Sequence, residues 1–152
     1  MPTAQRTRTI AASQQELWEL LGDPHHLPRW WPRVNRVEAV DEDAFTEVLM
    51  GGRGKMVRAD FKLLDAVSPR RIVWSQQVEN TPFARILTSA ETEISLSDVH
   101  ASDGPATEVT IELRQTLHGF FARLGSHLVR RAAASTIEEA LDGLERVAGR
   151  RG

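Results

Sequence analysis

Residues 107–147 read TEVTIELRQTLHGFFARLGSHLVRRAAASTIEEALDGLERV, and within this stretch the hydrophobic period changes from two to that of an α-helix. Val109, Ile111 and Leu113 alternate with polar residues, which predicts a strand with one covered face. From about residue 119 to residue 148, apolar side chains recur at helical spacing and predict one long amphipathic helix. Its expected apolar face consists of Phe120, Phe121, Leu124, Leu128, Ile137, Leu141 and Leu144.

Upstream of this helix, the sequence predicts a sheet of antiparallel strands joined by turns. Thr7 to Ala11 alternates weakly and predicts a first strand. Six further alternating segments follow, at 34–40, 44–50, 56–67, 72–78, 86–96 and 109–113. Most of the turns between them are rich in Gly, Pro, Asn, Asp or Ser. A curved sheet closed by one long helix leaves a cavity between the two, so we expect a cavity there.

Two short helices are expected between the first two strands. Ser13 stands three residues before Glu16, the spacing of a capping box, and Asp23-Pro24 begins the second helix. Pro28 and Pro32 limit the length of this second helix. The adjacent residues Trp30 and Trp31 must point in different directions, so we expect one to face the core and the other to face a cavity mouth or solvent.

Length and composition narrow the class of protein. A chain of 152 residues fits one domain, which we expect to span residues 1–152. The absence of cysteine excludes disulfides and thiolate chemistry and is compatible with a cytoplasmic location. No stretch is apolar enough for a signal peptide or a membrane span. With a net charge of −2 and mixed charges, we expect no nucleic-acid partner.

Several segments resemble the START-like (SRPBCC, Bet v 1-like) superfamily, closest to its polyketide cyclase/dehydrase-like branch. The resemblance lies in Ala12–Pro24, Leu27–Pro32, Pro69–Trp74 and Thr107–Ile111 before a long C-terminal helix, and it covers nearly the whole chain. It implies an α+β helix-grip fold, in which a seven-stranded curved antiparallel sheet wraps around the C-terminal helix and two short helices follow the first strand. Aromatase/cyclases of the superfamily are thought to use a polar pocket that often includes tyrosine, and this chain has no tyrosine.

Aromatic residues are the first candidates for a ligand-binding surface, because they offer a large contact area with few rotatable bonds. Each of them is also a candidate for the ordinary core between sheet and helix, and both interpretations stay open. Apolar residues of the last strand and the long helix complete the set. The predicted ligand-binding residues are Trp30, Trp31, Phe61, Trp74, Phe83, Ile111, Leu113, Phe121, Leu124 and Leu128.

Three residues are weak catalytic candidates. His118 and His127 flank the start of the long helix, where a histidine near a cavity can transfer protons around neutral pH. Arg114 is a candidate partner for an oxyanion or a carboxylate, with Arg85 and Glu91 as further charged candidates. The alternative for all of these is a solvated surface position. His25-His26 lacks the spacing of a metal site, so we expect neither a metal nor a cofactor.

Three functions remain open at this point. The first is binding or sequestration of a hydrophobic small molecule, such as a lipid, a polyketide or an isoprenoid. The second is a cyclase or dehydratase acting on a polyketide-like substrate. The third is a protein-interaction module with a collapsed cavity, similar to co-chaperone relatives, whose protein partner the sequence does not identify. The cavity distinguishes these functions. A binding protein needs an open apolar cavity, an enzyme also needs an acid/base group inside it, and an interaction module has no cavity large enough for a ligand.

Overall fold

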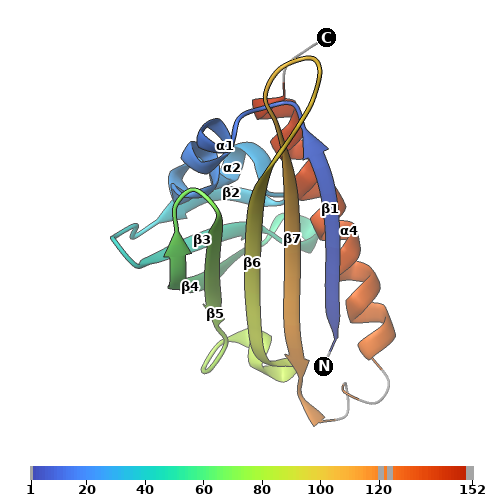
Figure 1. The fold of residues 1–152 in the computed structure, drawn as a ribbon. Helices are drawn as coiled ribbons and strands as arrows, with labels where there is room; N and C mark the ends of the chain where they lie inside the picture. The colour runs from blue at the N-terminus through green and yellow to red at the C-terminus, as the bar shows by residue number, and fades with distance from the viewer. Residues whose placement is uncertain (1, 120–121, 123–124, 150–152) are drawn as a thin grey trace.

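The computed structural model describes residues 2–119, 122 and 125–149. Over these residues the chain forms a seven-stranded antiparallel sheet curved around a long helix, α4 (Ser126–Ala148) (Figure 1). This confirms the predicted fold class. The strands are β1 (Thr3–Ile10), β2 (Val34–Glu38), β3 (Ala44–Met50), β4 (Met56–Val67), β5 (Arg71–Gln77), β6 (Leu87–Val99) and β7 (Ala106–Leu117). The shorter helical segments are α1 (Gln14–Leu21), η1 (Pro24–His26), α2 (Leu27–Trp30), η2 (Gly52–Gly54) and η3 (Pro82–Arg85).

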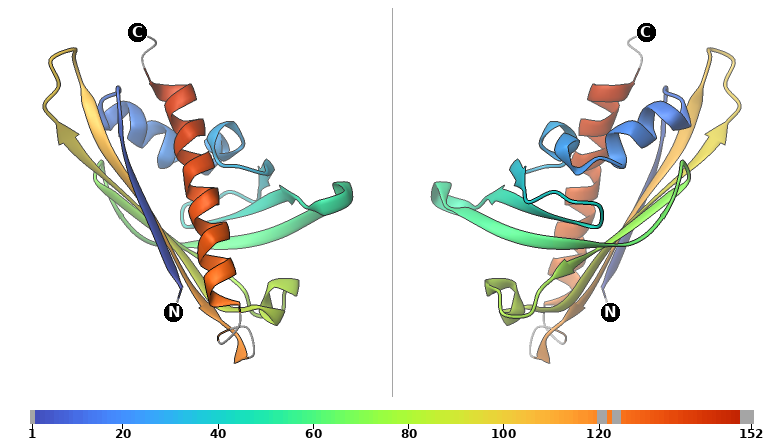
Figure 2. Two further views of the ribbon diagram at one scale, coloured as in Figure 1. Left: turned by 90° about the vertical axis from the view of Figure 1, so that its right-hand side faces the viewer. Right: turned by 90° about the vertical axis from the view of Figure 1, so that its left-hand side faces the viewer.

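The strand order is β1-β7-β6-β5-β4-β3-β2, so consecutive strands pair from β2 to β7 and β1 joins the far side of β7. The two side views show how this sheet bends (Figure 2). β1, β6 and β7 lie along one side of α4, while β3 and β4 cross it and extend to its other side (Figure 2). The helix therefore lies inside the curve of the sheet.

The turns into the short helices form as predicted. The Ser13 hydroxyl accepts a hydrogen bond from the backbone N–H of Glu16 at 3.1 Å, which caps α1. The Asp23 carboxylate accepts one from the backbone N–H of His25 at 3.0 Å, and Pro24 occupies the first position of η1. These caps fix the direction in which the chain enters α2 and so place the two tryptophans.

Ion pairs attach α4 to the edge strand β1. The Arg8 guanidinium lies 2.5 Å from the Asp142 carboxylate and 2.9 Å from the Glu138 carboxylate. Glu145 lies 3.6 Å from the same guanidinium, and Arg6 lies 3.5 Å from Glu138. The Arg8 side chain is only 23% exposed, so this cluster is less screened by solvent than an isolated surface pair.

A glycine lets α4 approach α2 closely. A Cβ atom at Gly143 would lie 2.2 Å from the backbone carbonyl oxygen of Trp30, far inside van der Waals contact. Trp30 itself is 2% exposed and belongs to the main apolar core. Gly143, which lowers intrinsic helix propensity, is therefore required by packing.

The buried apolar residues in the described part of the chain form two separate clusters. The larger one joins α1, α2, β1 and the second half of α4 to the sheet, and it includes Leu17, Trp30, Ile111, Ile137 and Leu144. The smaller one consists of Val78, Leu87 and Leu117, with Phe83, Ala90 and Val129 packed against it. Among the residues that the structure describes, the core is therefore not continuous along α4. Within residues 2–119, 122 and 125–149, no helix combines the length and hydropathy that crossing a membrane requires.

The structure corrects three details of the sequence analysis. The helix α4 begins at Ser126 rather than near residue 119, and Leu128 is 66% exposed. Leu128 lies nine residues before Ile137, which is about 180° around a helix of 3.6 residues per turn, so its assignment to the apolar face is wrong. A register shift between Leu87 and Ser89 disrupts the predicted alternation of β6, and Ile86 is exposed before this strand. The charged candidate Arg85 lies in η3, before β6 begins.

We predict that Gly143→Ala destabilises the fold by about 2–3 kcal/mol, because the added methyl group overlaps the Trp30 backbone and pushes α4 away from α2. This effect opposes the gain of up to about 1 kcal/mol in helix propensity. Urea denaturation measures the difference. Glu139→Ala, at an exposed position of the same helix, is the control and should change stability by less than about 0.5 kcal/mol. A stabilised Gly143→Ala variant would contradict the proposed packing.

Candidate functional site

A cavity of about 310 Å³ lies between the concave face of the sheet and α4. It borders on both apolar clusters, with Phe61, Trp74 and Leu113 packed in the larger one and Phe83 and Ala90 in the smaller one. This cavity therefore lies between the two apolar clusters. Its lining comes from strands, η3, the α2–β2 connection and α4, and comprises Trp31, Pro32, Arg33, Glu47, Leu49, Met50, Gly51, Val57, Phe61, Trp74, Gln76, Phe83, Ala90, Glu91, Thr92, Leu113, Gln115 and Thr136.

The register of the sheet explains which residues form the floor of this cavity. One row of directly paired residues crosses β3 to β7 as Phe45, Phe61, Gln76, Ala90 and Gln115. Because directly paired residues point to the same face of a sheet, the whole row faces the interior. Ala90, the member of this row on β6, has a small side chain and leaves room for the cavity there.

The next row contains Trp74, Thr92 and Leu113, which pair directly across β5, β6 and β7. Trp74 is 3% exposed and contacts Phe45 edge-on, with ring centroids 6.0 Å apart. Phe45 in turn stacks on Phe61 at 5.2 Å. These three rings form a rigid wall. Behind it lies a second, smaller cavity of about 130 Å³, which Trp74 also borders, between the α1–η1 region and the start of β3.

Glu47 is the unexpected residue of the site. It lies on β3 between Phe45 and Leu49, faces the cavity, and is only 4% exposed. Among the described residues, no hydrogen bond or ion pair reaches its carboxyl group. Burial without a compensating charge raises the pKa of Glu47 to about 8, so the carboxyl group is mostly neutral at pH 7.

Gln76 is the second polar group with unused hydrogen-bonding capacity. Its Nε2 atom is buried and has no hydrogen-bond partner among the described residues. Thr92, Gln115 and Thr136 add further polar atoms to the same lining. The site therefore combines aromatic walls with a small number of polar groups, a composition typical of cavities that orient a small molecule.

The structure brings five of the predicted ligand-binding residues together around the cavity: Trp31, Phe61, Trp74, Phe83 and Leu113. Trp30 and Ile111 are instead fully packed in the core, at 2% and 0% exposure, and do not line the cavity. Leu128 points to solvent. Phe121 and Leu124 lie outside the described residues. The adjacent tryptophans divide as expected, with Trp30 in the core and Trp31 at the cavity.

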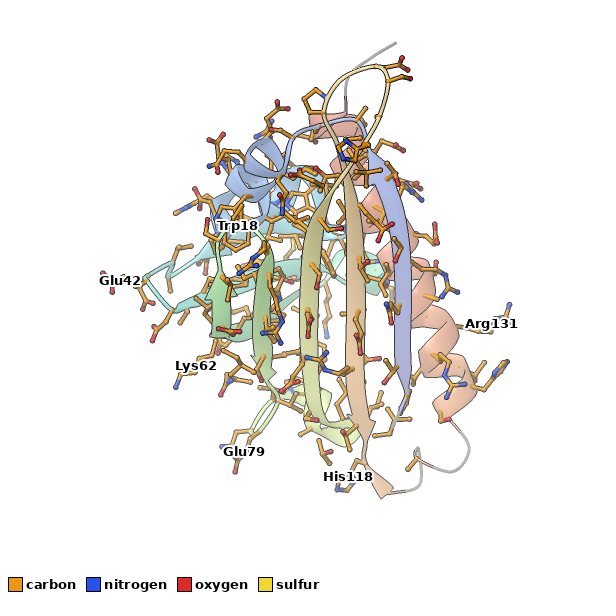
Figure 3. All side chains as sticks on the ribbon, viewed as in Figure 1. Trp18, Glu42, Lys62, Glu79, His118 and Arg131 are labelled. Carbon is orange, nitrogen blue, oxygen red and sulfur yellow. The ribbon has the colours of Figure 1, made fainter. Side chains whose placement is uncertain are left out.

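None of the three catalytic candidates is part of the cavity lining. His118 is exposed beyond the end of β7, where its side chain points away from the molecule (Figure 3). His127 is exposed in the first turn of α4. Arg114 alternates with the inward-facing Leu113, and its guanidinium group donates to the carboxylates of Glu91 at 3.3 Å and Glu93 at 3.0 Å. Arg114 therefore belongs to an ion-pair network on the outer face of the sheet.

Glu47 and Gln76 were not among the predicted site residues. The signal for Glu47 was present in the sequence, because the alternation of Phe45, Glu47 and Leu49 places all three side chains on one face of the strand. A carboxylate between two apolar residues on a covered face is either unfavourable or functional. Gln76 carries the same signal more weakly, between Trp74 and Val78.

We predict that Glu47→Gln stabilises the protein relative to the natural chain as pH rises from about 4.5 to about 8. Because the folded-state pKa lies above the unfolded one, the stability that comes from protonated Glu47 is complete below about pH 4.5 and is lost as pH approaches 8. The neutral amide is insensitive to pH, so the difference grows by at most about 1.4 kcal/mol per pH unit. Urea denaturation at pH 5 and pH 8 measures it.

The control for this prediction is Glu108→Gln, which removes a carboxyl group from an exposed position of β7. The change in stability relative to the natural chain should then not grow between pH 5 and pH 8. Equal pH dependence in the two variants would contradict the burial of an unpaired carboxyl group at position 47.

Comparison with known proteins places this architecture in a family. No protein with a curated description is significantly similar in sequence. Among solved structures, a START superfamily protein from Mycobacterium smegmatis has a TM-score of 0.78 at 14% identity, with 97% of each chain covered. A conserved protein from Geobacillus kaustophilus has a TM-score of 0.75 at 18% identity, covering 95% of this chain and 93% of its own. The Zhui aromatase/cyclase from Streptomyces sp. R1128 has a TM-score of 0.65 at 18% identity, with 95% and 94% covered.

These identities are low, so the likeness to the solved structures is one of fold. The family model described as "Polyketide cyclase / dehydrase and lipid transport" matches residues 1–149, which is nearly the whole chain. The match agrees with the helix-grip sheet and with the aromatic cavity beneath α4. The chain belongs to this polyketide cyclase/dehydrase and lipid transport family.

Proposed function

We propose that this protein binds a hydrophobic small molecule, of the lipid, polyketide or isoprenoid kind, in the cavity between the sheet and α4. The observation that carries the proposal is the aromatic-lined cavity of about 310 Å³, which separates the two apolar clusters. This volume lies near the lower end of the range of ligand cavities, about 300–1,000 Å³. It suits a compact molecule of one to three rings better than a long unfolded chain.

The free energy gained by burying apolar ligand surface is large enough to support measurable binding. A ligand that buries about 300 Å² of apolar surface gains roughly 7–8 kcal/mol at about 25 cal/mol per Å². Ordering and association reduce this gain, but the walls are already held in place by ring contacts, so little side-chain freedom is lost on binding. Micromolar affinity is therefore the expected scale.

A cyclase- or dehydratase-type reaction is the second candidate, and Glu47 is the observation that favours it. A buried carboxyl group with a raised pKa can act as an acid or a base near neutral pH. The histidines predicted for this role are exposed away from the cavity. An interaction module with a collapsed cavity has less support, because the cavity is open. Cytoplasmic location and the absence of a nucleic-acid partner stay predictions from the sequence alone.

We predict that the neutral dye N-phenyl-1-naphthylamine binds with micromolar affinity and that Ala90→Phe weakens this binding at least about tenfold. Ala90 sits in the floor between Gln76 and Gln115, so an added ring fills the cavity. Fluorescence titration gives both affinities. Circular dichroism checks that the variant remains folded.

The matched control is Ser89→Phe, which adds the same ring at the neighbouring exposed position of β6. Its affinity for the dye should equal that of the natural chain. Loss of binding in both variants, or in neither, would count against the cavity as the binding site.

A further inference from the structure

Two polar side chains on the concave face of the sheet, Glu47 and Gln76, have hydrogen-bonding capacity that no described residue uses. Glu47 pairs directly with Val37 on β2 and Ala59 on β4, so its neighbours across the sheet offer it no hydrogen-bonding side chain. An unpaired buried carboxyl group makes the folded state less stable than an apolar residue would at the same position. Because Glu47 lowers the stability of the fold and has no partner in it, we infer that this residue serves to contact a ligand in the cavity.

The charged groups around Glu47 leave it uncompensated. From the α2–β2 connection, the cavity is lined by Arg33, which is exposed and forms no ion pair among the described residues. Glu91 on β6 also borders the cavity, but its carboxylate accepts a hydrogen bond from Arg114 in the ion-pair network of the outer face. From α4 comes only the uncharged Thr136. The sole cause of the raised pKa of Glu47 is burial.

A neutral carboxyl group is a hydrogen-bond donor as well as an acceptor. Its O–H is free to point into the cavity, because among the described residues nothing accepts it. The Gln76 amide offers a second free donor through Nε2, from the row that crosses the cavity floor. Two unsatisfied hydrogen-bond donors in one cavity favour a ligand that carries a hydrogen-bond acceptor.

We propose that Glu47, as the neutral acid, and Gln76 together bind a carbonyl or hydroxyl oxygen on an otherwise apolar, uncharged ligand. The inference rests on the proposed function and specifies its ligand class. A pure hydrocarbon leaves both donors unsatisfied. A cation would ionise Glu47 favourably but would bring a positive charge towards the Gln76 donor. The aromatic walls Trp74 and Phe61 suit a flat, conjugated body attached to this oxygen.

The test compares two probes that differ in one group. In 2-acetylnaphthalene the side group is a carbonyl, and in 2-isopropenylnaphthalene a CH₂ group replaces the oxygen at nearly the same shape. Displacement of N-phenyl-1-naphthylamine gives both affinities at pH 6 and at pH 9.5, on either side of the Glu47 pKa of about 8. At pH 6 the natural chain should bind the ketone at least about tenfold more tightly. At pH 9.5 that preference should fall severalfold, because a carboxylate cannot donate a hydrogen bond.

Two variants at position 47 separate charge from hydrogen bonding. Glu47→Gln keeps a neutral donor of the same shape and should retain the preference for the ketone at both pH values. Glu47→Leu should lose most of the preference at both pH values while still binding the hydrocarbon probe. Gln76→Leu should reduce the preference and leave its pH dependence intact.

Other outcomes overturn the inference in distinguishable ways. Equal affinity for both probes in the natural chain, with the hydrocarbon still bound, refutes the polar site and leaves the hydrophobic cavity in place. Tighter binding of N,N,N-trimethyl-2-naphthylammonium at pH 9.5 than at pH 6, abolished by Glu47→Gln, would identify a carboxylate–cation site instead. Failure of the dye and both probes to bind refutes the proposed function together with the inference.

Discussion

The cavity exists because a straight helix is held against only one side of a strongly curved sheet. Arg8 on β1 contacts three carboxylates of α4, and Gly143 brings the same helix against the backbone of Trp30. These contacts fix α4 along β1 and α2. The sheet meanwhile bends away towards β3 and β4 (Figure 2). Since the helix cannot follow this bend, the side chains of β3 to β6 face space that α4 does not fill.

Packed aromatic rings and ion pairs surround this space. Phe45, Phe61 and Trp74 contact one another through defined ring geometries, and Trp74 separates the main cavity from the smaller one behind it. On the outer face, Arg71 and Arg114 bind the shared carboxylate of Glu93 and tie β5, β6 and β7 together. A ligand therefore meets a largely preformed surface, which limits the entropy lost on binding. The polar residues Glu47 and Gln76 are the places where this surface departs from an ordinary core.

Much of the fold was predictable because alternation and helical spacing follow directly from backbone geometry. The caps at Ser13 and Asp23 and the division of Trp30 and Trp31 between core and cavity followed from local chemistry. Leu128 was misassigned because it continues the sequence spacing of Phe120, Phe121 and Leu124, whereas the buried face of α4 is the one with Ile137, about 180° around the helix. The alternation predicted for the segment 86–96 fails at its start because β6 has a bulge there, and a bulge depends on the neighbouring strand.

The site was harder to predict than the fold. Five of the aromatic and apolar candidates surround the cavity, but Ile111 and Trp30 are packed away from it, and residue type alone does not distinguish these positions. The acid/base candidates were chosen by residue type, as histidines, and both are exposed. Glu47 was overlooked although its position on the strand already placed it inward. The position of a residue in the alternating pattern of its strand was a better guide to its role in the cavity than its residue type.

The most direct test of this account is native mass spectrometry of the protein purified from its own host, followed by denaturing extraction of any bound compound. The account predicts a compact, neutral, apolar molecule with a carbonyl or hydroxyl oxygen, present in at most one copy per chain and released on denaturation. A protein that carries no such compound and takes up none from a total lipid extract of the host would contradict it.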